Sequence, residues 1–274
     1  MTHRIASLGM YDHPAQRNAN DQLWTAISRL LRERGVEDVP PHLDRTQDVQ
    51  ATWRDPRLLL AQACGYPLAV DTTLALRVVA LPVYDAPGCV GATHTSILVA
   101  RANDEWVSIE AFRGARAAIN DAHSNTGMNL FRATLAPIAG HSSATGGFFQ
   151  TVIATGSHRG SIVAVGAGDA DIAAIDCVTY AAIARFEPEL TARLRILMSS
   201  PESPTLPFVT AASTSAATVV ALECALRHVM LDPELAAVRA CLFLAGTAPA
   251  DEAISVPIMR LQSNAARAGY PDLR

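Results

Sequence analysis

Two short segments in the middle of the chain, residues 123–129 and 155–161, constrain its fold most strongly. Each combines serine, threonine or asparagine with a glycine and stands directly before an apolar stretch with helical periodicity. Such residues cap helix starts, where free backbone N–H groups and the positive end of the helix dipole attract anions. The second segment also carries His158. We therefore expect two helix starts that form converging walls of an oxyanion pocket.

Strand-like and helix-like stretches alternate along most of the chain. Such alternation predicts an α/β fold with parallel sheets covered on both faces, and a ligand at the carboxyl ends of the strands. Two blocks of this kind predict two lobes with a cleft between them. Asp55-Pro56 favours a helix start because proline suits the first helical position. We expect strands at 5–10, 76–83, 96–100, 115–119, 149–154, 172–175 and 194–198, and helices at 20–35, 57–64, 126–135, 161–167, 177–186, 216–229, 233–244 and 257–268.

Size and composition narrow the class of protein. A chain of 274 residues, half of them hydrophobic, has room for two lobes with their own cores. The net charge of -4 and the lack of a Lys/Arg run argue against a nucleic-acid partner. No apolar run approaches the roughly 18 residues of a membrane span, so we expect no membrane insertion. Because no secretory signal is recognisable and the five cysteines are scattered, the expected location is cytoplasmic. A periplasmic location is the alternative if an export signal has been removed.

Enzyme signatures fit this sequence poorly. The Gly166-x-Gly168 segment resembles a dinucleotide fingerprint, but Asp171 replaces its third glycine. Residues 156–160 do not form a nucleophile elbow, since the serine stands one place early. No metal-ligand spacing is present, so we expect neither a metal nor another cofactor. A set of Ser124, His158 and Asp176 that meets in space is the remaining catalytic alternative.

The motifs together resemble a known family, the phosphate/phosphite/phosphonate substrate-binding proteins of ABC transporters, in particular its subgroup without an export signal. The resemblance runs from about residue 5 to 244 and implies the type II periplasmic-binding-protein fold with a ligand cleft between two α/β lobes. It implies one lobe of residues 1–98 plus 207–274 and another of 99–206, joined by crossings at 95–100 and 206–212. The motifs that carry it lie at 58–68, 93–97, 123–129, 155–161, 165–176 and 206–208.

The resemblance also implies a set of ligand contacts. Ser124, Thr126 and Gly127 match a Ser-x-Ser-Gly turn that holds phosphorus oxygens, with Thr126 in place of the second serine. His158 matches the histidine of a Gly-Ser-His motif and is expected to donate a charge-assisted hydrogen bond. His94 departs from the pattern, because many members have tyrosine there. The complete expected ligand-binding set is Tyr11, Tyr66, His94, Ser124, Asn125, Thr126, Gly127, His158 and Asp176.

Structural roles compete with these functional ones. Ser124, Thr126 and Asp176 would serve as plain helix caps, and His158 as a core histidine. Two functions follow from the sequence. The first is non-catalytic binding of a small anion, of phosphonate or phosphate type, by a component of an ABC uptake system with a permease partner or by an intracellular sensor. The second is a small-molecule enzyme on the same two-lobed scaffold.

Overall fold

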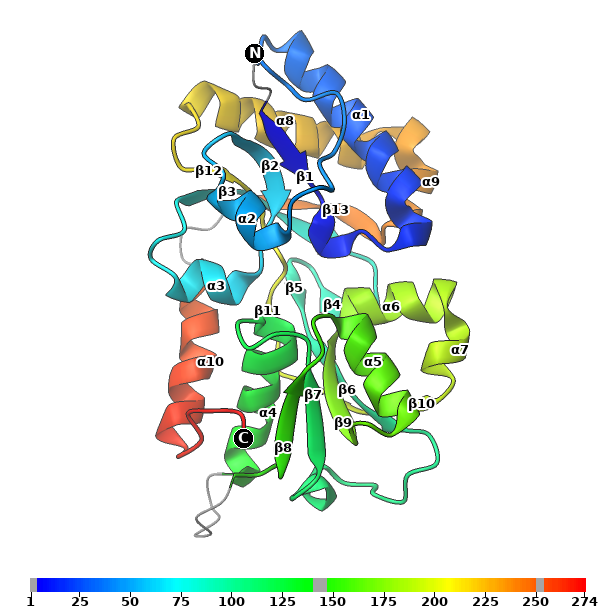
Figure 1. Cartoon of the computed structure of the whole chain (residues 1–274). Helices are drawn as coiled ribbons and strands as arrows, with labels where there is room; N and C mark the ends of the chain where they lie inside the picture. The colour runs from blue at the N-terminus through cyan, green and yellow to red at the C-terminus, as the bar shows by residue number, and fades with distance from the viewer. Residues whose placement is uncertain (1–3, 140–146, 250–253) are drawn as a thin grey trace. The chain divides into compact units, whose positions relative to one another are not determined.

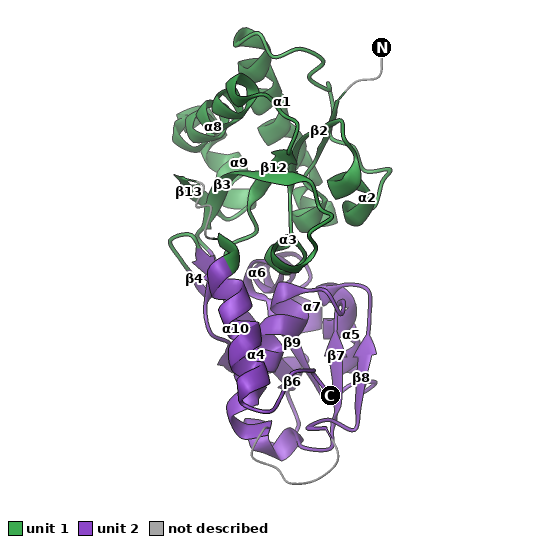
Figure 2. Cartoon of the chain, turned by 90° about the vertical axis from the view of Figure 1, so that its left-hand side faces the viewer, with its two compact units in different colours: residues 1–85, 90–92, 204–255 green, residues 86–89, 93–203, 256–274 purple. Residues whose placement is uncertain are grey.

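The computed structural model describes residues 4–139, 147–249 and 254–274 as a mixed α/β protein (Figure 1). The chain divides into two compact units (Figure 2). Unit 1 comprises residues 1–85, 90–92 and 204–255, and unit 2 comprises residues 86–89, 93–203 and 256–274. The fold class expected from the alternation of strands and helices is therefore confirmed.

Unit 1 is built on a five-stranded sheet in the order β1-β2-β12-β3-β13. Strand β2 is parallel to β1, whereas β12 is antiparallel to both of its neighbours. The strands are β1 (Ile5–Ser7), β2 (Leu58–Gln62), β3 (Leu76–Tyr84), β12 (Phe208–Ala211) and β13 (Leu244–Pro249). The helices are η1 (Gly9–Tyr11), η2 (Pro14–Gln16), α1 (Arg17–Glu33), α2 (Val49–Arg54), α3 (Gly65–Val70), α8 (Ala216–Leu231), η5 (Pro233–Leu235) and α9 (Ala236–Cys241).

Two predicted helices of unit 1 are wrong. The run expected as a helix over 57–64 is the interior strand β2, which lies between β1 and β12 and whose residues are all buried. A continuous apolar run fits a buried strand as well as a buried helix, and Asp55 makes a turn with Arg57 instead of a helix cap. The helix expected over 233–244 ends at Cys241, because Phe243 adopts a positive φ of 57° and Leu244 begins β13.

Unit 2 contains a second five-stranded sheet in the order β10-β6-β9-β7-β8. Strand β7 is parallel to β8 and β9, while β6 is antiparallel to β9 and β10. Both sheets are therefore mixed, and the prediction of parallel sheets is wrong for the strands that lead into and out of each unit. The strands are β6 (Ser96–Arg101), β7 (Arg116–Ile119), β8 (Thr151–Ala154), β9 (Ile172–Asp176) and β10 (Leu194–Ser199). The helices are η3 (Ile109–Phe112), η4 (Asn125–Asn129), α4 (Leu130–Ala139), α5 (His158–Ala167), α6 (Cys177–Phe186), α7 (Pro188–Thr191) and α10 (Ser255–Arg267).

The order of the three parallel strands positions the helices of unit 2. The step from β7 through α4 to β8 runs in one direction across the sheet, and the step from β8 through α5 to β9 runs back. Because such crossovers are right-handed, α4 and α5 cover opposite faces of the sheet, as Figure 1 shows. The carboxyl ends of β7, β8 and β9 meet at one edge, and each leads into a helix start.

The carboxyl-terminal segment belongs to unit 2. The Arg132 guanidinium donates to the carbonyl of Pro271 at 2.8 Å, and the Phe148 N–H donates to the carbonyl of Arg274 at 2.5 Å. In the expected division these residues belonged to the first lobe, with crossings at 95–100 and 206–212. In the observed division the chain enters the main part of unit 2 at Thr93 and leaves it after Ser203. Both positions lie in a small sheet of β4 (Cys89–Val90), β5 (Thr93–His94) and β11 (Ser203–Pro204). As lobes of a binding protein, the expected division stays a prediction.

Candidate functional site in unit 2

Three helix starts gather at the carboxyl edge of β7, β8 and β9. The Ser124 hydroxyl accepts from the Gly127 N–H at 2.9 Å and opens η4, which runs directly into α4. The Ser157 hydroxyl accepts from the Gly160 N–H at 2.9 Å at the start of α5, and Asp176 accepts from the Thr179 N–H at 2.9 Å at the start of α6. Each cap satisfies one free N–H, and the remaining ones make this edge electropositive.

The first of these starts is a π-helical turn that is packed tightly around a glycine. A Cβ at Gly127 would lie 1.8 Å from Oδ1 of Asn120 and 3.2 Å from Cε1 of His158. Only glycine therefore lets this backbone approach both side chains. Asn120 directly follows β7, and its Oδ1 is buried with no hydrogen-bond partner within the described part of the chain.

Thr126 and His158 join the first and second helix starts. Oγ1 of Thr126 lies 3.0 Å from Nε2 of His158. The carbonyl of Thr126 accepts a hydrogen bond of 2.7 Å from the buried Ser96 hydroxyl on β6. Thr126 is buried and His158 is half-buried. The backbone of Thr126 is thus held by Ser96 and its hydroxyl by His158.

A buried histidine–carboxylate pair stands at the third helix start. Nδ1 of His94 lies 3.2 Å from Oδ2 of Asp176, and these residues are 0% and 2% exposed. Burial alone lowers the pKa of His94, but the neighbouring carboxylate outweighs it and raises this pKa above its ordinary value. Burial likewise opposes ionisation of Asp176, yet His94, His158 and the Thr179 N–H bring the pKa of Asp176 down to about 2. His94 and Asp176 thus each favour the charged form of the other.

His158 behaves differently from the expected cation. Burial lowers its pKa, and the opposing effects of the Asp176 charge and the Ala174 carbonyl do not compensate. The imidazole is consequently neutral at neutral pH, with Nε2 engaged by Thr126. Nε2 of His158 lies beside the Thr126 hydroxyl, and donation by His158 to a bound oxyanion stays a prediction.

Asn125 is part of a buried polar chain that fixes the turn from behind. Its amide donates to the Ser203 hydroxyl at 2.8 Å, and its Oδ1 accepts from the Asn129 amide at 3.0 Å. Oδ1 of Asn129 in turn accepts from the Arg132 guanidinium at 2.6 Å. These bonds give Asn125 a positioning role for the turn.

The structure brings most of the predicted residues into one unit. His94, Ser124, Asn125, Thr126, Gly127, His158 and Asp176 all lie in unit 2, around the helix starts just described. Tyr11 and Tyr66 lie in unit 1, where Tyr11 ends η1 with its ring edge-on to Tyr84 at 5.5 Å and Tyr66 is buried in α3.

Sequence reasoning missed two residues of this cluster, Asn120 and Ser96. A polar residue directly after a buried strand is the signal that would have indicated Asn120. No local pattern indicates Ser96, because only the pairing of β6 with β9 brings it beside Asp176.

The catalytic alternative does not match the observed contacts. In a Ser-His-Asp relay the histidine takes the proton of the serine hydroxyl. Here the Ser124 hydroxyl caps η4, Nε2 of His158 meets Thr126, and Asp176 pairs with His94. Each of these three side chains thus has a partner other than the one that a relay requires.

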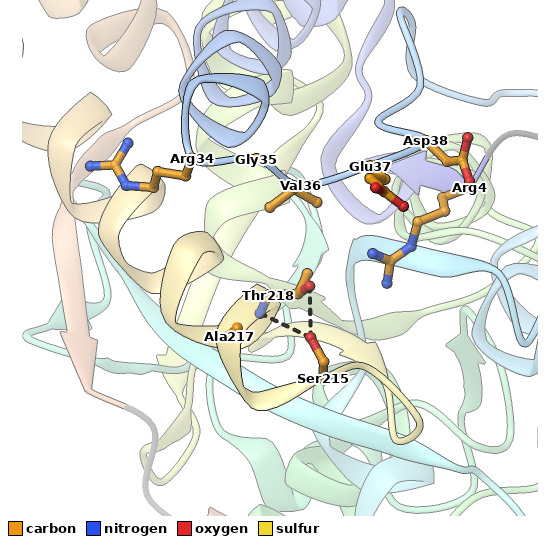
Figure 3. A pocket seen from close by; sticks show the side chains of 9 residues that line it. All are labelled: Arg4, Arg34, Gly35, Val36, Glu37, Asp38, Ser215, Ala217 and Thr218. Carbon is orange, nitrogen blue, oxygen red and sulfur yellow. Dashed lines mark hydrogen bonds between the residues drawn. The ribbon is translucent and has the colours of Figure 1, made fainter.

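A separate pocket of about 420 Å³ lies in unit 1 and contains none of the predicted residues (Figure 3). It is lined by two arginines and two carboxylates, Arg4, Arg34, Glu37 and Asp38, beside the Ser215 cap of α8. Because these charges cancel, the pocket offers an anion no net attraction. The helix starts of unit 2 are therefore the better candidate for an anion site.

Comparisons with known proteins agree with this geometry. The family model described as "ABC transporter, phosphonate, periplasmic substrate-binding protein" matches residues 57–253. No curated protein matches the chain by sequence. Among the helices of residues 4–139, 147–249 and 254–274, none has the length and apolar character needed to span a bilayer.

Solved structures share the fold at low sequence identity. The binding-protein component of an ABC phosphonate transporter from Pseudomonas aeruginosa has a TM-score of 0.72 and 18% identity, with 90% of this chain and 82% of that one covered. PhnD1 from Prochlorococcus marinus, solved with methylphosphonate, has a TM-score of 0.70 and 15% identity, covering 92% and 94%. XAC2383 from Xanthomonas citri, solved with chloride, has a TM-score of 0.68 and 15% identity, covering 94% and 95%.

Proposed function

The chain belongs to the phosphonate periplasmic substrate-binding protein family of ABC transporters, and on this premise we propose that its unit 2 binds the oxyanion group of a phosphonate. The carrying observation is the meeting of three helix starts at one sheet edge, with the Thr126 hydroxyl held 3.0 Å from His158. Backbone amides at helix starts bind phosphorus oxygens without a cationic side chain. Binding by amides and hydroxyls also suits a protein that must later release its ligand.

The proposed contacts start from Ser124, Thr126, Gly127 and His158. The amides of the π-turn and the Thr126 hydroxyl donate to the oxyanion, and the Nε2–H of His158 donates to Oγ1 of Thr126, which leaves the hydroxyl proton for the ligand. Ser124 caps the turn, and Asn125 anchors it through Ser203. Tyr11 and Tyr66 of unit 1 stay in the proposed set of ligand contacts, as the family resemblance implies.

The chemistry of the ligand and the partner follow from the family. PhnD1 from Prochlorococcus marinus, which shares this fold, holds methylphosphonate, and methylphosphonate is therefore our first candidate. The partner is an ABC permease, and the place of action is the periplasm named in the family's description. The ligand leaves unchanged, because Ser124 is engaged as a helix cap instead of being poised as a nucleophile.

A thermal-shift screen with phosphate, phosphite, methylphosphonate, a sulfonate and a carboxylate tests this function. A bound ligand raises the free energy of unfolding by mass action, by about 2.7 kcal/mol at a hundred times its Kd, and the unfolding temperature rises with it. We expect the phosphorus oxyanions to stabilise the protein and the carboxylate to have no effect. Phosphorus NMR of the recovered ligand distinguishes binding from catalysis. A converted ligand would favour the enzyme alternative, and no stabilisation by any phosphorus compound would contradict the proposal.

A further inference from the structure

Asp176 places a negative charge close to the proposed anion site. Asp176 on β9 lies opposite Ser96 on β6 in the register of the sheet. The Ser96 hydroxyl in turn donates a hydrogen bond to the carbonyl of Thr126. The carboxylate also influences His158 electrostatically. A carboxylate at this position repels an oxyanion over a few ångströms of poorly screened protein. The cluster needs something that cancels this charge.

His94 is the group that meets the carboxylate. Its ring is 0% exposed, and its Nδ1 lies 3.2 Å from Oδ2 of Asp176. The other oxygen, Oδ1, accepts from the Thr179 N–H at 2.9 Å. Asp176, Cys177 and His158 are the titratable groups that influence His94 from the elements packed around it. Among these, only Asp176 is a full negative charge at neutral pH.

We infer that His94 determines ligand specificity by acting as an internal counter-cation for Asp176. With the carboxylate cancelled inside the protein, the site accepts phosphonates that carry no amino group in preference to aminophosphonates. Without His94, Asp176 repels an anion and attracts a ligand ammonium group. The inference rests on the proposed function, because it concerns which phosphonate that same site takes. His94 acts through Asp176 and is a positioning residue that need not touch the ligand.

The charge arithmetic makes the inference testable by a double-mutant cycle. His94→Gln removes the cation and leaves the Asp176 carboxylate uncompensated. In an Asp176→Asn background the carboxylate is already absent, so His94→Gln there removes an imidazole that has no negative partner. The asparagine at position 176 keeps the capacity to cap α6. A purely structural role of His94 predicts equal losses in both backgrounds. A counter-cation predicts a loss only where the carboxylate is present.

The probes are methylphosphonate and 2-aminoethylphosphonate, measured by isothermal titration calorimetry on the full chain. We expect His94→Gln to weaken methylphosphonate binding about tenfold in the wild-type background and less than about twofold in the Asp176→Asn background. The ratio of the two affinities should shift toward 2-aminoethylphosphonate only in the single variant. Asp171→Asn is the matched control, because it removes a buried aspartate at the opposite end of β9.

Each outcome decides the inference. If the single variant does not fold, the double variant must fold and bind methylphosphonate, since it lacks both charges; failure to bind would overturn the inference. Equal losses in the two backgrounds, or an unchanged ligand ratio in a folded single variant, would overturn it while leaving the proposed function intact. A wild-type chain that binds neither phosphonate would overturn the proposed function and this inference together.

Discussion

Replacing Gly127 with alanine tests whether the π-turn must lie against Asn120 and His158. The new Cβ would stand 1.8 Å from Oδ1 and 2.9 Å from Cγ of Asn120, and 3.2 Å from Cε1 of His158. The amide of Asn120 must therefore rotate or the turn must move. Either adjustment displaces the backbone amides that we propose hold the oxyanion.

The size of the effect follows from two opposing contributions. Overpacking a buried site costs about 1–3 kcal/mol. The better helix propensity of alanine returns up to about 1 kcal/mol. The free energy of unfolding should thus fall by roughly 1–2 kcal/mol, which lowers the Tm by a few degrees in a protein of this size. Losing one well-placed donor to a charged ligand weakens affinity by roughly tenfold or more.

Thermal unfolding and calorimetric titration with methylphosphonate would measure both effects. Gly166→Ala is the matched control, because a Cβ at this position in the last turn of α5 would meet only Arg193 at an ordinary 3.6 Å. That control should be neutral or slightly stabilising. Adding Asn120→Ala to Gly127→Ala removes the clashing amide and should restore most of the lost stability. Wild-type stability and affinity in Gly127→Ala would refute the argument from close approach.

Three further predictions concern charge and redox chemistry in unit 2. Asp171→Asn should destabilise the fold by about 1–2 kcal/mol in chemical denaturation, because Asp171 accepts three hydrogen bonds from Arg116; unaltered stability would contradict this. Asp171 and Asp176 each have a pKa of about 2, lowered from 3.8, so each contributes stability above pH 4 that is lost as the pH falls toward 2, about 2 kcal/mol per group. A stability profile over this range that is equally steep in the two Asn variants would argue against it. The thiols of Cys89 and Cys177 lie 3.4 Å apart, and oxidised glutathione should join them with release of two reduced glutathiones. The contact with Cys89 and burial raise the pKa of Cys177, which makes the exchange slow at neutral pH. The count of free thiols should fall from five to three, and Cys89→Ser should prevent this loss.

The sequence predicted most elements of unit 2, because their signals are local. The helix over 177–186 has the predicted bounds, and Gly168 ends α5 with the positive φ of 85° expected of a helix stop. The failures concern information that is not local. The apolar run at 58–62 is a strand because it pairs with β1 on one side and β12 on the other, and the antiparallel direction of β12 depends on how the chain returns to unit 1.

The candidate site was predicted only in part for the same reason. Hydroxyl-rich helix starts are visible in a sequence, and they indicated Ser124 and Thr126. The pairing of His94 with Asp176 joins residues 82 positions apart (176 minus 94) through the register of neighbouring strands, and no local pattern indicates it. The neutral state of His158 also depends on burial, which motif matching does not reveal.

Calorimetric titration of methylphosphonate into the wild-type chain and into His158→Ala tests the central claim most directly. The wild-type chain should bind the ligand saturably at one site. The variant removes the ring that lies 3.0 Å from the Thr126 hydroxyl, so its affinity should fall by roughly ten- to a hundredfold while its unfolding temperature changes little. Unchanged affinity in a folded His158→Ala protein would contradict the assignment of the oxyanion site to these helix starts.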